Sequence, residues 1–319
     1  MALATFPGGS GSITSTAQAA PFIPELWSDE IVASYKKNLM FANLVNKMSM
    51  VGKKGDTLHI PKPTRGLANI KAANTAVTIQ ADTETEVQVV VDKHYEYSRM
   101  IEDIAGVQAL DSMRRFYTED AGYALAKQID DDIFSLGMSL GDGVGSSWAH
   151  SNSYYLDAAT GITPYAADTV TPTDIFSDAG FRELIKLMDD QDVPMDGRFM
   201  IVPPAARRDI LGIARYNSSD FVDGRATQTG LIGNLYGIDI FVSSNCPVIE
   251  TAADNSVSTV DTKAAILGHK DTFVLAEQMG VRSQTQYKQE YLADLFTADT
   301  LYGVKTLRSE TGFVIALPN

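Results

Sequence analysis

The chain has 319 residues, 45% hydrophobic and 21% charged, a composition that suits a globular protein of about one to three domains and excludes wholesale disorder. Its formal net charge is −14 at pH 7, which argues against a nucleic-acid-binding protein with a general basic surface, because such binding depends on Lys and Arg neutralising phosphates. The one cysteine, Cys246, excludes an internal disulfide framework and favours a reducing compartment.

The chain begins with a segment of low complexity. Residues 1–20, MALATFPGGSGSITSTAQAA, carry no charge and have little apolar surface to bury, so we expect a flexible arm. Residues 21–50 are more apolar, and Ser28 is a candidate cap for a short helix that would lie against another surface. No Lys or Arg precedes Lys36, and no apolar run approaches the ~20 residues that span a bilayer, so we expect a protein made in the cytosol without a membrane partner.

A long two-faced strand follows. Residues 83–97, TETEVQVVVDKHYEY, alternate between Thr, Val or Tyr on one side and mostly charged or amide residues on the other, which predicts one strand. With residues 55–62 as its partner and the polar residues 65–78 as its tip, it predicts a long, thin β-hairpin. A two-stranded ribbon has no second layer to cover its apolar face, so an isolated monomer gives this hairpin no obvious support.

A long helix is predicted next, over residues 101–140. Apolar residues recur there at spacings of three and four, which is typical of an amphipathic helix, and Glu102 and Asp103 would lie in its favoured acidic first turn. A Gly- and Ser-rich loop region follows, to about residue 172.

The second half of the chain has the texture of a compact α/β domain. Ser177 is a candidate cap for a helix that carries Phe181, Leu184 and Met188. Pro203 and Pro204 favour the start of another helix. Strands are predicted at residues 198–202, 238–242 and 264–267, and several more between 280 and 317. The chain as a whole is therefore expected to be α+β.

Motifs that carry chemistry are missing. The four histidines, His59, His94, His150 and His269, show no zinc-ligand or catalytic spacing. The glycines at 141, 143 and 145 lack the features of a phosphate-binding loop and indicate a turn. The aspartates at 130–132 and at 189, 190 and 192 are expected on solvated faces or helix ends, and Cys246 as a small buried hydrophobe. We therefore predict no enzyme, no cofactor, no metal ion, and no catalytic, cofactor-binding or metal-binding residue.

Basic pairs at the predicted hairpin and on the predicted helix are either ordinary surface or candidates for contacts between copies of the chain. Such pairs would meet acidic patches on a neighbour and fix its register. The apolar side of the hairpin would bind the same neighbour. The residues that we assign to this interface are Lys53, Lys54, Arg65, Glu84, Glu86, Val87, Val89, Val91, Arg114 and Arg115.

The order of these elements resembles the major capsid protein of tailed bacteriophages, with the Hong Kong 97 type capsid fold. The resemblance lies mainly in FRELIKLMDDQDVPMDGRFMIVPPAARRDIL, in GLIGNLYGIDIFVSSNCP and in the closing strands from GHKDTFVLAEQMG to GFVIAL. It implies an N-terminal arm at 1–50, an E-loop hairpin at 51–97, a P domain with its spine helix and following loop at 98–164, an A domain at 165–275, and returning P-domain strands at 276–319.

The resemblance implies a structural function. The chain would self-assemble into hexamers and pentamers of an icosahedral head that encloses double-stranded DNA without sequence-specific binding, and it would be assembled in the host cytoplasm and found in the virion. Expected partners are further copies of itself, a portal protein, a separate scaffolding protein and possibly a decoration protein. Two alternatives stay open: an encapsulin-like nanocompartment shell, and an acidic soluble hydrolase or ligand-binding protein.

Overall fold

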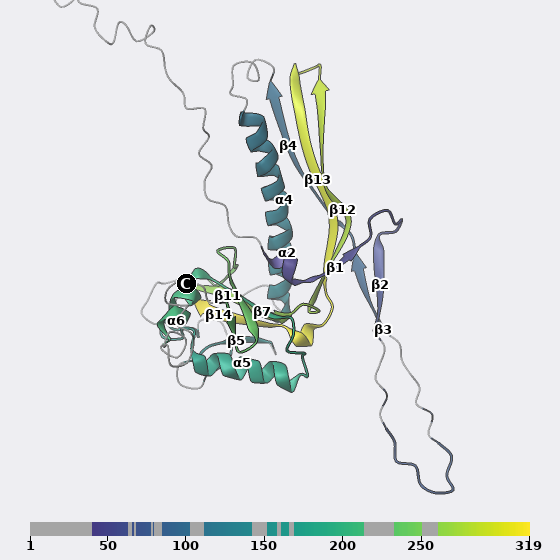
Figure 1. Ribbon diagram of the computed structural model, residues 1–319, viewed down its shortest axis with the longest axis vertical. Coiled ribbons are helices and arrows are strands. Elements are labelled where there is room, and N and C mark those ends of the chain that lie inside the picture. Colours follow the sequence, from purple (N-terminus) through teal and green to yellow (C-terminus); the bar gives the residue numbers. More distant parts are fainter. Residues whose placement is uncertain are drawn as a thin grey trace, which may run out of the picture.

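The computed structural model describes residues 40–62, 66, 68–77, 79, 85–102, 112–141, 152–157, 161–165, 169–213, 233–250 and 261–319. These residues form an elongated layer of long strands beside a long helix, a more compact sheet with two helices, and a separate hairpin that projects from the molecule (Figure 1). The flexible arm, the Ser28 cap, Asp103 and His150 lie outside the described residues.

The elongated layer is a four-stranded sheet in the order β1-β12-β13-β4. Its strands are β1 (Asn46–Ser49), β12 (Phe273–Lys288), β13 (Ala293–Thr306) and β4 (Lys93–Glu102). Helix α4 (Ser112–Met138) runs beside the sheet and continues into the 3₁₀ turn η2 (Ser139–Gly141). Ala121 and Leu125 of α4 pack on Phe296 and Ala298 of β13, so the helix covers one face of the layer.

The compact part is an eight-stranded sheet in the order β6-β5-β14-β11-β7-β9-β8, with β10 also paired to β11. Helices α5 (Asp178–Asp190) and α6 (Pro204–Gly212) cover one face, whereas Phe134 of α4 packs on the other. This double cover explains why β7 is buried at every residue. The strands are β5 (Ser153–Tyr155), β6 (Thr163–Pro164), β7 (Arg198–Val202), β8 (Asn234–Leu235), β9 (Ile238–Val242), β10 (Val248–Glu250), β11 (Thr262–His269) and β14 (Phe313–Pro318).

Local signals in the second half of the sequence are confirmed. The Ser177 side chain accepts a hydrogen bond from the Gly180 amide at 3.2 Å and caps α5. Pro203 precedes α6 and Pro204 opens it. The strands predicted at 198–202, 238–242 and 264–267 are β7, β9 and part of β11. Each signal depends on neighbours in sequence, which is why it could be read without the fold.

The hairpin is shorter than predicted. β2 (Thr57–Lys62) pairs with β3 (Thr85–Val90) in a two-stranded sheet, and the strand ends there. After Val91 and Asp92 the chain enters β4, which pairs with β13 instead. The alternation itself is correct, because Val87, Val89 and Val91 lie on the more buried side of the strand. Periodicity sets the faces of a strand but does not name its hydrogen-bond partner.

The predicted start of the long helix is wrong. Ile101 and Glu102 are the last residues of β4, where Ile101 pairs with Asp294 and Glu102 with Ala293. The described helix begins at Ser112. The apolar spacing over residues 101–104 fits a helix and a strand end equally well, and pairing with β13 decides between them.

The two larger sheets meet around one aromatic side chain. Phe41, from the short helix α2 (Phe41–Leu44), is fully buried. Its ring packs edge-on against Phe134 of α4, Phe199 of β7 and Phe273 of β12, with ring centroids 4.8, 5.8 and 5.7 Å apart. Phe41 therefore joins the helix to both sheets.

Candidate assembly surfaces

The root of the hairpin, which we define as residues 57–60 and 87–91, packs on its own chain. Val89 is fully buried and Val91 nearly so, in a cluster with Met50 of the segment after β1 and with Val274 and Ala276 of β12. This corrects the expectation that a neighbouring molecule covers Val89 and Val91. The sequence shows an apolar face, but the strand that covers it lies about 180 residues further along the chain.

Other predicted interface residues remain accessible. Lys53, Lys54 and Glu86 are exposed, and Val87 is half-buried. These four side chains lie on the hairpin or on the turn that leads into it, and the described part of the chain leaves them accessible to a neighbour. The remaining predicted residues, which are Arg65, Glu84 and the side chains of Arg114 and Arg115 on α4, lie outside what the structure describes.

The outer face of the hairpin carries a small polar network. His59 Nδ1 lies 3.0 Å from Glu86 Oε2, and Gln88 also donates to the Glu86 carboxylate. The hydrogen bond from Gln88 and then that from His59 lower the pKa of Glu86 from its ordinary value. Glu86 therefore has one partner across the hairpin, His59, and one on its own strand, Gln88, so its carboxylate already has hydrogen-bond partners in its own chain.

The tip of the hairpin, which we define as the described residues 66, 68–77 and 79, is exposed throughout. It lies far from both larger sheets in Figure 1. Ile70 and Ile79 are almost fully exposed and Val77 is largely so. Residues 62–81 contain two Lys and one Arg and no Asp or Glu, in a chain of net charge −14. The tip is therefore apolar and locally basic, whereas the chain is acidic.

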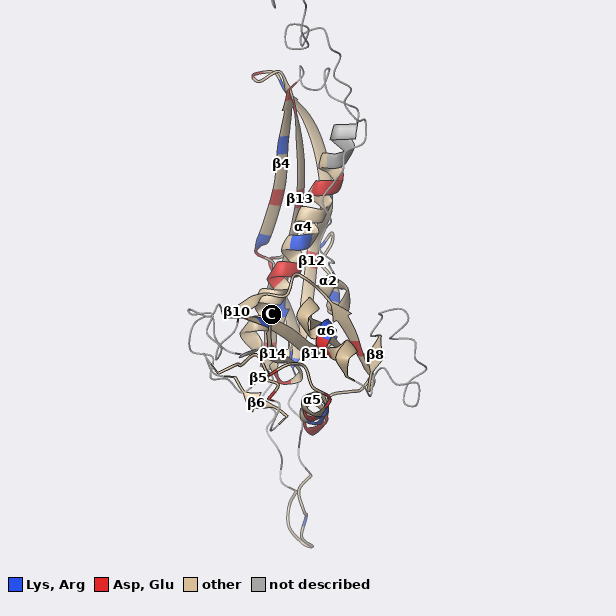
Figure 2. Ribbon diagram, turned by 90° about the vertical axis from the view of Figure 1, so that its left-hand side faces the viewer, with Lys and Arg blue, Asp and Glu red and all other residues tan. Residues whose placement is uncertain are grey.

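Charges elsewhere on the described surface are mixed. Figure 2 shows acidic and basic residues along β4 and α4, and both kinds on α5. On α4, Lys127 pairs with Asp131 one turn later, and on α5, Arg182 Nε lies 3.2 Å from Asp178 Oδ2. This distribution provides acidic groups that a basic tip of another copy can approach.

Asp130 and Asp132 are not on a solvated face, which corrects the prediction for these two residues, whereas Asp131 is partly exposed. Asp130 is fully buried in α4, and its Oδ1 accepts hydrogen bonds from the amides of Phe41 at 2.9 Å and Ala42 at 3.3 Å. Asp132 accepts from the Tyr302 hydroxyl at 2.6 Å and lies 3.1 Å from Lys93 Nζ. Their partners come from α2, β13 and β4, which the order of residues along α4 does not reveal.

Burial dominates the electrostatics of this cluster. It raises the pKa of Asp130, against the lowering effect of the two amides. It also raises the pKa of the Tyr302 hydroxyl, with the hydrogen bond to Asp132 as the next cause. The cluster therefore fastens α2 to α4 through Asp130 Oδ1 and β4 to β13 through Asp132, whereas Asp130 Oδ2 is buried without a hydrogen-bond partner among the described residues.

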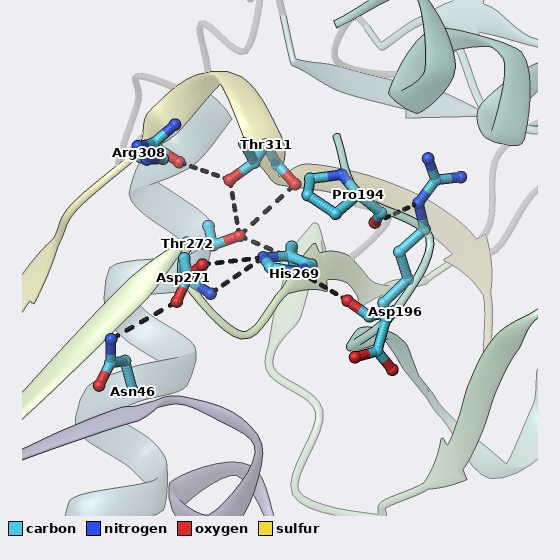
Figure 3. A network of polar contacts seen from close by, with 9 residues as sticks. Asn46, Pro194, Asp196, His269, Asp271, Thr272, Arg308 and Thr311 are labelled. Carbon is cyan, nitrogen blue, oxygen red and sulfur yellow. Dashed lines mark hydrogen bonds and ion pairs between the residues drawn. The ribbon is translucent and has the colours of Figure 1, made fainter. Parts of the chain in front are cut away.

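A second polar network joins the two larger sheets where the chain crosses between them (Figure 3). His269, buried at the end of β11, has Nε2 2.8 Å from the Asp196 carbonyl, and its Nδ1 accepts from the Asp271 amide at 3.2 Å. Thr272 Oγ1 lies 2.9 Å from Thr311 Oγ1, in the 3₁₀ turn η3 (Ser309–Thr311). The network ties the turn between β11 and β12 to the connection between β13 and β14.

The side chains whose chemistry could support catalysis, such as His94, Asp299 and Cys246, are held by ion pairs or buried in the core. His94 Nε2 lies 3.1 Å from Asp299 Oδ2, and Arg282 donates to both oxygens of the same carboxylate. The hydrogen bond from Arg282 is the main reason that the pKa of Asp299 falls to about 2. Cys246 is buried, which raises the pKa of its thiol to about 12. Within the described residues, no cluster of three His, Cys, Asp or Glu side chains is arranged to hold a metal ion.

The family of the chain follows from comparison with known proteins. A family model described as phage capsid protein matches residues 40–314. The chain belongs to the phage capsid protein family. The described helices of this capsid protein include none that is both long enough and apolar enough to cross a membrane.

Solved structures agree with the capsid protein over almost its full length. A chain from Mycobacterium phage Che8 has 24% identity and a TM-score of 0.70, with 92% of this chain and 97% of that chain covered. The capsid structure of cyanophage P-SCSP1u has 17% identity and a TM-score of 0.73, with 95% of this chain and 94% of that chain covered. The capsid of cyanophage Pam1 has 11% identity and a TM-score of 0.68, with 99% of both chains covered. No curated protein matches the sequence.

These findings establish the fold and the role of the capsid protein. It has the Hong Kong 97-like fold that its element order resembles, and it is a major capsid protein of a phage head. Self-association into a capsid lattice and a place in the virion belong to that role.

Proposed function

We propose that the capsid protein assembles into hexamers and pentamers of an icosahedral head through contacts between the hairpin tip of one copy and the body of its neighbour. The exposed tip carries the proposal, because Ile70, Val77 and Ile79 lie there without cover from their own chain. Burial of apolar surface contributes roughly 25 cal/mol per Å², so covering these side chains favours association.

Charge supports the same partner. Residues 62–81 are basic in an otherwise acidic chain, so the surface of a second copy attracts the tip while the bodies of the two copies repel each other at long range. Lys53, Lys54, Arg65, Glu84 and Glu86 fit a contact of this kind, as do Arg114 and Arg115 on α4. Val87 is half-buried and can extend the contact toward the root.

The two larger sheets support a domain division close to the predicted one. We assign the four-stranded sheet and α4 to the P domain, and the eight-stranded sheet with α5 and α6 to the A domain. β14 pairs with β11 and therefore falls in the A domain, so the chain ends there rather than among the P-domain strands. The hairpin is the E-loop, and the residues before Phe41 are the N-terminal arm.

The proposed content of the head is double-stranded DNA, held without sequence-specific contacts. A net charge of −14 keeps an inner wall from binding a polyanion tightly, which leaves the DNA free to move. We infer a purely structural role without catalysis, assembly in the host cytoplasm, and a portal, a separate scaffolding protein and possibly a decoration protein as partners.

Electron microscopy of the purified protein tests the proposal. Wild-type protein should form closed shells or capsomers, and Ile70→Asp should keep the unfolding midpoint of wild type but lose assembly, because the charge prevents burial of the tip. Ile70→Val is the matched control and should assemble normally. Shells from Ile70→Asp in wild-type yield would overturn the tip contact, and a wild-type protein that stays monomeric would overturn the proposed assembly.

A further inference from the structure

The hairpin crosses its own sheet at a position that has room only for glycine. Gly303 lies near the C-terminal end of β13, paired with Ala276 of β12. A Cβ added at Gly303 would lie 2.2 Å from the carbonyl oxygen of Val90 and 3.0 Å from the Cα of Val91. The atoms it would meet are backbone, which cannot rotate away, so the absence of a side chain at Gly303 is what lets the end of β3 lie directly on β13.

A β-bulge supplies a second fixed point. The register of β12 against β13 shifts between Glu277 and Met279, which leaves Gln278 as the extra residue. Bulges redirect side chains, and here the Gln278 amide Nε2 donates to the carbonyls of Lys53 at 3.2 Å and Gly55 at 2.8 Å. One side chain of the body thus holds both sides of the turn that enters the hairpin.

A charged pair lies further out on the hairpin. Lys62, the last residue of β2, has its Nζ 3.8 Å from Glu310 Oε1 in η3. Both side chains are about half exposed, so the pair contributes little to stability. It nevertheless links the last paired residue of β2 to the connection between β13 and β14.

We propose that Gly303, Gln278 and the Lys62–Glu310 pair form a mount, which sets the direction in which the hairpin leaves its own subunit and thereby the angle between neighbouring copies in the shell. This inference rests on the proposed tip contact. From Lys62 to Asn74, an extended chain reaches about 40 Å, so a tilt of about 10° at the mount displaces the tip by about 7 Å. A displacement of that size exceeds what a packed contact tolerates.

The geometric part of the proposal can be measured in the isolated subunit. Spin labels at Ala73→Cys in the tip and Ala126→Cys on the exposed face of α4 report the hairpin direction, and buried Cys246 should not be labelled. Wild type should give one narrow distance distribution, whereas Gly303→Ala and Gln278→Ala should shift or broaden it. Unchanged distributions in both variants would overturn the mount, whether or not the protein forms shells.

The assembly part is tested by electron microscopy of the shells. Gly303→Ala and Gln278→Ala should give roughly fivefold fewer closed shells or a changed diameter, the size of effect expected when each repeated contact is weakened modestly. The matched controls are Gly122→Ala, whose new Cβ would have nothing within 4 Å, and Gln284→Ala, an exposed position on the same strand as Gln278. Both controls should assemble as wild type.

A charge exchange covers the case in which Gly303→Ala fails to fold. Lys62→Glu and Glu310→Lys each place like charges together and should alter shell yield or diameter without changing the unfolding midpoint. The double variant Lys62→Glu/Glu310→Lys should restore the shell yield and the shell diameter of wild type. Shells of wild-type size and yield from both single variants and from Gln278→Ala would overturn the mount, whereas failure of wild type to assemble would instead overturn the proposed function.

Discussion

The root and the tip of the hairpin lie in the same segment of the chain but have opposite surroundings. At the root, Val89 is fully buried by Met50, Val274 and Ala276 of its own chain. At the tip, Ile70 and Ile79 have almost their whole surface exposed. The comparison separates two roles that an apolar residue on a ribbon can have, because the root stabilises the subunit and the tip is available to another copy.

Substitution at the root should give the largest effect on the subunit. Val89→Asp places an unpaired charge in a fully buried site, and we expect a loss of about 3–5 kcal/mol in the free energy of unfolding, measured by urea denaturation. If a neighbouring molecule covered Val89, as expected from the sequence, this variant would fold and fail only in assembly. A Val89→Asp subunit as stable as wild type would show that the root is not packed on its own chain.

Substitution of Phe41 should reduce the stability of the subunit nearly as much. Phe41→Ala removes a buried ring that packs against Phe134, Phe199 and Phe273, and we expect about 3 kcal/mol of destabilisation in the same denaturation experiment. Phe41→Leu, which keeps most of the volume, should lose clearly less. Equal losses for the two variants would mean that the site collapses around the missing ring.

The pH dependence of stability should distinguish the buried carboxylate of Asp130 from an exposed one. Burial raises the pKa of Asp130 above its unfolded value, so the folded state favours the neutral form and the charged form costs stability above that folded pKa. Asp130→Asn keeps an acceptor for the Phe41 and Ala42 amides without the charge. The variant should be more stable than wild type at pH 7, and the difference should vanish as the pH falls below the unfolded pKa. Equal stability at pH 7 would contradict this account.

Asp299 should behave in the opposite way, with a smaller effect. Its pKa is lowered to about 2, mainly by the hydrogen bond from Arg282, so its contribution is present above the unfolded value and is lost as the pH falls toward 2. Asp299→Asn should therefore flatten the acid limb of the stability curve. Because Arg282 is half exposed, we expect a change of no more than about 1 kcal/mol at pH 7.

The smallest effect on stability should be at the tip. Ile79→Asp removes no contact in the described chain, so its free energy of unfolding should stay within about 0.5 kcal/mol of wild type. The same variant should nevertheless reduce shell yield in the assembly assay. A large loss of stability would show that the tip packs on its own body in solution.

What the sequence could predict follows from the range of the interaction. The Ser177 cap, the buried strand β7 and the Pro203–Pro204 helix start depend on residues a few positions apart. The cover of Val89, the partners of Asp130 and the space above Gly303 depend on strands or helices far away in the sequence, and no local pattern encodes them. Of the residues predicted at the interface, the exposed charged ones are still proposed to contact a neighbour, whereas Val89 and Val91 belong to the subunit core.

Hydrogen exchange of the same residues in the isolated subunit and in the assembled shell tests the central claim most directly. Residues 87–91, including the Val91 amide bonded to the Asp56 carbonyl, should be protected in both states. Residues 68–77 should exchange freely in the subunit and become protected in the shell. Free exchange of residues 68–77 in intact shells, or protection of the root only after assembly, would contradict the account.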